Sequence, residues 1–143
     1  MLRRRRFFQG RRIHGSAVKD IAWFSPDGKE MTDEEWSQGF VRCLGMRLAG
    51  DAIDETDSRG QPIVGDTLLV LLNAHHEPMS FAVPAHKRGV RWELLLDTAH
   101  PDERVDEKSK VSAYKGGARY ELAARSLAVL RLRKTPSRPH SSA

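Results

Sequence analysis

The clearest pattern of apolar and polar positions lies in residues 67–84. It opens with five consecutive apolar residues, Leu68–Leu72, which have turn residues on both sides. A short run of this kind is typical of a strand buried on both faces, although a buried helical segment has the same pattern. After a polar stretch at 73–78, apolar residues alternate over 79–83, as in a half-buried strand. We predict two strands joined by a polar corner, together with further strands that cover them.

Alternation with a period of two predicts two more strands elsewhere in the chain. The first covers residues 40–50, and the second places Trp92, Leu94 and Leu96 on one side of the sheet. A turn at residues 86–89 precedes the second strand.

The segment 20–30 is predicted to be a short apolar element followed by a turn. Its Pro-Asp-Gly sequence supplies first a fixed φ and then a glycine that can adopt a positive φ. Thr32–Glu35 has the threonine-to-acid spacing of a capping box, so we expect one helical turn that ends near Trp36.

Two segments near the carboxyl end are less clear. Residues 98–117 are polar, charged and contain glycine, and we expect a long mobile loop there. Residues 120–132 are rich in alanine, leucine and arginine, so their composition favours a helix, whereas their apolar pattern also suits a strand buried on both faces. The proline- and serine-rich end of the chain is predicted to be a disordered tail.

The charge of the chain is unevenly distributed. Of the formal net charge of +5, residues 1–19 carry +7 and residues 131–143 carry +4, so residues 20–130 carry −6. The acidic body argues against nucleic-acid or phosphate binding by the domain itself. The basic arm could be disordered, bind nucleic acid, or contact a neighbouring domain. No apolar run is long enough to span a membrane, and the arginines are not followed by the apolar stretch of an export signal.

Few residues offer chemistry. The single cysteine, Cys43, lies in an apolar alternation and is expected in the core, and a chain with one cysteine suits a reducing cytoplasm. His75 and His76 precede Glu77, but adjacent residues of an extended strand point to opposite faces, which argues against a shared metal. Carboxylates fall on polar loops, and no nucleophile elbow or phosphate loop is present. We therefore expect no catalytic residue, metal or cofactor.

Several stretches together resemble one family. The clearest are Asp20-Ile-Ala-Trp-Phe-Ser-Pro-Asp-Gly28 and Leu71-Leu-Asn-Ala-His-His-Glu-Pro78. The others, in chain order, are Leu2–Gly10, Glu30–Trp36, Cys43–Met46, Gly50–Ala52, Trp92–Thr98 and Ala124–Leu127. In order and approximate spacing, they are similar to the carboxy-terminal region of bacterial glycogen debranching enzymes, the isoamylase-type members of the alpha-amylase clan.

This resemblance implies an antiparallel β-sandwich packed on a catalytic (β/α)8 barrel that hydrolyses α-1,6 branch linkages. It also implies that residues 124–132 form the last strand, against the helical composition. The barrel residues that carry catalysis in the family have no counterpart here. We expect an all-β, antiparallel β-sandwich over 20–132, preceded by the irregular basic arm or barrel-joining segment at 1–19 and followed by a disordered tail at 133–143.

The first functional hypothesis is an accessory domain of a debranching enzyme, inactive alone and partnered by the catalytic barrel. The second is a glucan-binding module in which paired tryptophans form a stacking platform, and the third is nucleic-acid binding through the arm. Candidate residues for substrate or barrel contact are Phe7, Phe8, Trp23, Trp36, His75 and His76.

Overall fold

The computed structural model describes residues 19–39, 41–50, 57–61, 65–86, 88–101 and 112–134. The basic arm with Phe7 and Phe8, and the chain beyond residue 134, lie outside these ranges. The elements are β1 (Ile21–Phe24), α1 (Asp33–Trp36), β2 (Cys43–Leu48), β3 (Leu68–Asn73), β4 (Met79–Ala82), β5 (Val90–Asp97), β6 (Ala113–Tyr114), β7 (Arg119–Leu122) and β8 (Ser126–Lys134). Within this part of the chain, no helix is long and apolar enough to cross a membrane.

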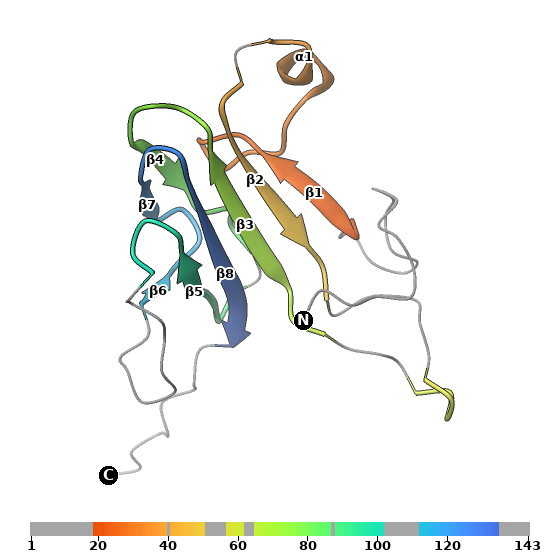
Figure 1. The fold of residues 1–143 in the computed structure, drawn as a ribbon. Helices are drawn as coiled ribbons and strands as arrows, with labels where there is room; N and C mark the ends of the chain where they lie inside the picture. Colours follow the sequence, from red (N-terminus) through yellow and green to blue (C-terminus); the bar gives the residue numbers. More distant parts are fainter. Residues whose placement is uncertain are drawn as a thin grey trace.

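The strands form two antiparallel sheets, which confirms the predicted all-β sandwich. The large sheet has six strands in the order β1-β2-β3-β8-β5-β6, and the small sheet pairs β4 with β7. Figure 1 shows the small sheet beside one face of the large one, with α1 near the end where β2 begins. The two strands predicted around the polar corner therefore belong to different sheets.

The turns and the short helix follow the sequence closely. Gly28 has a φ of +79°, as the Pro-Asp-Gly turn requires. Thr32 caps α1: its hydroxyl accepts a hydrogen bond from the Glu35 N–H at 3.3 Å, and its own N–H donates to the Glu35 carboxylate at 2.8 Å. The predicted capping box and helical turn are confirmed.

Composition alone gives a wrong prediction for residues 120–132, where the structure has β7, a turn and β8. Arg125 closes that turn with a φ of +48°. β8 lies between β3 and β5, and Ala128 and Leu130 are fully buried in the core. Pairing on both sides overrides the helical preference of alanine and leucine, as the family resemblance implied.

The predicted loop at 98–117 is also corrected. Ala113–Tyr114 form the edge strand β6, which pairs with β5 at Trp92 and Glu93. A pair of residues is too short to produce a readable alternation, so the sequence pattern could not reveal this strand.

A β-bulge in β5 overturns the predicted alternation of Trp92, Leu94 and Leu96. Leu94 is opposite Leu130 and Leu96 is opposite Val129, so one extra residue is inserted between them. The side chain of Leu96 therefore points away from the core and is 40% exposed, whereas Asp97 turns inward. The buried Asp97 carboxylate accepts hydrogen bonds from the Tyr120 hydroxyl and, at 2.9 Å, from the Ala99 N–H.

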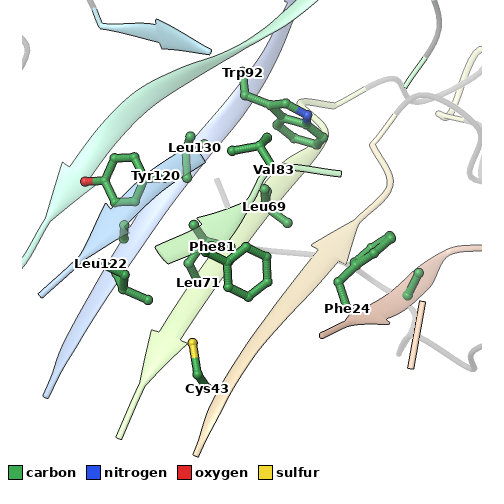
Figure 2. Close-up of a cluster of buried hydrophobic side chains, with 12 residues drawn as sticks. Phe24, Cys43, Leu69, Leu71, Phe81, Val83, Trp92, Tyr120, Leu122 and Leu130 are labelled. Carbon is green, nitrogen blue, oxygen red and sulfur yellow. The ribbon is translucent and has the colours of Figure 1, made fainter. Parts of the chain in front are cut away.

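The core lies between the two sheets (Figure 2). Phe81 of β4 is completely buried, and its ring lies against the backbone of β2 at Gly45. A Cβ at residue 45 would lie 2.8 Å from the Phe81 Cζ and 3.3 Å from a methyl carbon of Leu71. Gly45 thus provides the space in which the small sheet packs on the large one. Cys43, predicted to be a core residue, is buried in the same cluster.

We predict that Gly45→Ala lowers the free energy of unfolding by about 1–3 kcal/mol, because its methyl group overlaps the Phe81 ring. Phe81→Leu should remove much of that penalty, so the two substitutions should couple by about 1 kcal/mol in a double-mutant cycle. Urea denaturation of the four proteins measures both values. This packing would be contradicted if Gly45→Ala lowered the free energy of unfolding equally with phenylalanine or leucine at position 81.

Candidate functional site

The outer face of the large sheet, opposite the core, is the most unusual surface of the described chain. Side chains alternate between the two faces of a strand. Because Leu69 and Leu71 enter the core, their neighbour Val70 points outward, and the same holds for Val129 between Ala128 and Leu130. An outward position on a one-sided sheet is normally polar.

Five apolar side chains cross this face in register. We call them the outer row: Trp23 of β1, Met46 of β2, Val70 of β3, Val129 of β8 and Leu96 of β5. Each is opposite the next one across neighbouring strands, and all five are at least partly exposed. A second, shorter row beside it consists of Leu44, Leu72 and Leu127. Contiguous apolar side chains on an outer sheet face are typical of sites where another protein or domain makes contact.

Trp36 extends the outer row at its β1 end. Its ring centroid lies 5.4 Å from that of Trp23, with the ring planes at 84°, and Trp36 is 47% exposed. The structure thus brings the two predicted tryptophans together. Nearly perpendicular rings do not form the flat two-ring platform of the glucan hypothesis, although a single ring can still stack on a sugar.

A charged group borders the outer row at β5 and β8. The Glu93 carboxylate accepts hydrogen bonds from Arg131 at 2.9 Å and from Arg133 at 3.2 Å. Partial burial by itself raises the pKa of Glu93, but the hydrogen bonds and positive charges of the two arginines outweigh this effect, and the net pKa is lowered. An apolar centre with a charged edge is the usual composition of a protein interface.

The corner between β3 and β4 is held by Asn73, which is buried. Its side-chain amide donates to the backbone oxygens of Glu77 at 2.9 Å and Ala123 at 3.0 Å, and its oxygen accepts from the His75 N–H at 2.9 Å. The backbone oxygen of His75 accepts from the Arg125 N–H at 3.0 Å. Asn73 therefore joins the β3–β4 corner to the β7–β8 turn.

This bend corrects the prediction that His75 and His76 point to opposite faces. Their rings stack with centroids 4.2 Å apart, and the possible ligand atoms of His75, His76 and Glu77 lie within 4.8 Å of one another. Donors around one zinc ion lie within about 4.2 Å, because each bond is about 2.1 Å. In addition, His75 Nδ1 accepts the Glu77 N–H at 3.1 Å, so in the neutral ring the proton is on Nε2. With this hydrogen bond in place, neither nitrogen of His75 is available to a metal.

A hollow of about 340 Å³ lies at the same end of the sandwich. Its lining residues include Met31, Glu35, Val41, Arg42, Cys43, His75 and Met79. Burial raises the pKa of the Cys43 thiol to about 11, so the thiol is protonated near neutral pH and is a poor nucleophile. Glu35 is the only carboxylate that lines any of three hollows formed by the described residues. Glycoside hydrolysis requires a pair of carboxylates, which these hollows do not supply.

The structure thus separates the predicted residues into two groups. Trp23 and Trp36 belong to the outer face, whereas His75 and His76 belong to the corner, where His75 borders the hollow. The rest of the outer row was not recognisable from the sequence. Consecutive apolar residues in β3 and β8 indicated burial on both faces, but their alignment with Met46 and Leu96 depends on strand order and on the β5 bulge.

Comparison with known proteins gives two agreeing results. The family model described as "Isoamylase, C-terminal" matches residues 20–131. Proteins named "Glycogen operon protein GlgX homolog" from Mycobacterium bovis and Mycobacterium tuberculosis are 42% identical to this chain over 132 residues. The match covers 92% of this chain and 18% of each relative, so the chain spans about a fifth of the length of these curated relatives.

We predict that Glu93→Gln destabilises the domain by about 1 kcal/mol at pH 7. The pKa of Glu93 is lower in the folded state, so its stabilising effect is present above the unfolded pKa of about 4.3 and is lost as the pH falls through the folded value. Urea denaturation from pH 7 to pH 3 should show the difference from wild type disappearing in acid. Glu121→Gln, at an exposed position of β7, is the control and should have little effect. A difference that stays constant over this pH range would contradict the assigned ion pair.

Proposed function

The chain belongs to the isoamylase C-terminal family, and from that premise we propose that it is the accessory β-sandwich of a glycogen-debranching glycoside hydrolase. In this proposal, a separate (β/α)8 barrel cleaves α-1,6 branch linkages, and the sandwich supports that barrel. The proposal places the protein in the cytoplasm, which suits a chain with one buried cysteine.

The outer row is the observation that carries this proposal. It extends across β1, β2, β3, β8 and β5, with Trp36 at one end and the Glu93 ion pairs at its border. The row spans five strands, which suits another folded domain better than a small ligand. We propose that the catalytic barrel packs on it, with Trp23 and Trp36 in the contact. The short extent of the match within the relatives supports such a neighbour.

The corner residues have a different role in this proposal. His75 and His76 sit on a bend that Asn73 fixes by hydrogen bonds at both of its ends. We propose that they contact the edge of the barrel or its substrate rather than act as catalysts. Phe7 and Phe8, outside the described ranges, remain predicted contacts of the segment that joins the sandwich to the barrel.

Glucan binding is the second candidate function. Its specific support is the exposed ring of Trp36, which could stack on one sugar residue. A packed barrel would cover the same ring, so the two functions predict different environments for Trp36. We favour the barrel contact because the apolar surface continues well beyond this one ring.

The test is a chimera in which this chain replaces the matching region of the Mycobacterium tuberculosis relative. We expect release of reducing ends from glycogen limit dextrin by the chimera and none by this chain alone. Val70→Lys should lower the activity of the chimera by at least about tenfold, because it places a charge in the centre of the interface.

Ser80→Lys, a partly exposed position on the small sheet, adds the same charge away from the outer row and should leave activity unchanged. In the isolated chain both variants should unfold at nearly the wild-type temperature, since neither side chain enters the core. Equal activity of the two chimeras would refute the docking face, and turnover by the isolated chain would refute the accessory role.

A further inference from the structure

A second, strongly basic hollow lies at the start of β5, away from the corner and the outer row. Its volume is about 280 Å³, and it lies between the β4–β5 turn and the turn that joins β6 to β7. Basic side chains come from both turns and from β5: His86, Arg88, Arg91 and Lys115. No carboxylate is among its lining residues.

The two turns are held together by the backbone. The Val83 N–H donates to the Ala118 oxygen at 2.9 Å, and the Gly117 N–H donates to the Val83 oxygen at 2.8 Å. Gly116 lies so close to Ala85 that a Cβ at residue 116 would be 2.8 Å from the Ala85 Cα. The start of the β4–β5 turn is therefore held against the β6–β7 turn.

A buried tryptophan forms the floor of the hollow. Trp92 is 1% exposed, and its indole N–H donates to the Pro84 oxygen at 3.1 Å. The His86 ring lies with its centroid 6.2 Å from that of Trp92. The floor is thus rigid, and the ends of Arg88, Arg91 and Lys115 remain exposed to solvent.

The acidic groups nearest along the same strands are already engaged. Glu93 holds Arg131 and Arg133, and Asp97 is turned into the core against Tyr120. Among the described residues, no ion pair joins Arg88, Arg91 or Lys115 to a carboxylate. The acidic net charge of residues 20–130, which argued against phosphate binding, is thus a sum that conceals a local basic cluster.

We propose that this hollow binds a phosphate group, either as free phosphate or as a phosphate monoester. Arginine forms paired hydrogen bonds with phosphate oxygens, and lysine adds a compact positive charge. Clustered like charges repel each other in the empty site, and a dianion relieves that repulsion while it gains hydrogen bonds. The volume is at the lower limit of small-molecule sites and suits a phosphate with at most one sugar-sized group.

Isothermal titration of the full chain with inorganic phosphate, and separately with a hexose 6-phosphate, tests this proposal at constant ionic strength. We expect saturable binding that weakens with added salt. The double variant Arg88→Gln/Arg91→Gln should raise Kd by at least about tenfold. Tighter binding of the hexose phosphate would identify a monoester as the ligand, and weaker binding of it would identify free phosphate.

The matched control is Arg42→Gln/Arg119→Gln, which removes the same charge from two exposed arginines outside the hollow. It should change Kd by less than about twofold. An equal rise in Kd in both double variants would show general charge attraction and overturn the site. The absence of saturable binding at millimolar concentrations of either probe would also overturn it. Thermal unfolding of the variants verifies that they fold.

Discussion

Apolar side chains on both faces of one six-stranded sheet are the constraint on which this structure depends. On the inner face, Leu69, Leu71 and Leu130 are completely buried beneath the small sheet. On the outer face, Val70 lies between Leu69 and Leu71 in the sequence, and Val129 directly precedes Leu130. Within the described chain, no second sheet covers these two valines. The exposed face of a one-sided antiparallel sheet is normally polar, so an apolar outer row suits contact with a neighbouring domain.

The internal packing explains why the outer face is so regular. Phe81 fills the space above Gly45 and fixes the small sheet on the large one, and Asn73 joins the β3–β4 corner to the β7–β8 turn. With β8 held between β3 and β5, the outer side chains of neighbouring strands align in register. The interior therefore positions the surface that we assign to the catalytic barrel. The basic hollow at the start of β5 occupies a separate part of the fold.

Much of the fold was predictable from the sequence because its signals are local. The capping box at Thr32, the turn at Gly28 and the buried run of β3 each depend on a few adjacent residues. The predictions that failed concern features that depend on residues far away in the sequence. Residues 120–132 adopt strands because β3 and β5 pair with β8, and Leu96 points outward because a bulge changes the register of β5.

The candidate sites show the same division. Trp23 and Trp36 were identifiable as large aromatic residues, but their contact and the row beyond them appear only once strand order is known. The stacking of His75 on His76 required the bend at residues 75–77, which an extended chain does not have. The basic hollow combines two turns about thirty residues apart in the sequence, and neither turn is conspicuous alone.

Photo-crosslinking can identify what covers the outer row. A photoreactive benzoylphenylalanine at position 96, which is exposed at the end of the row, would be irradiated in the chimera built on the Mycobacterium tuberculosis relative. The docking account predicts cross-links from position 96 to peptides of the catalytic region, and none from position 121 on the exposed face of the small sheet. Cross-links from position 121 alone would contradict it.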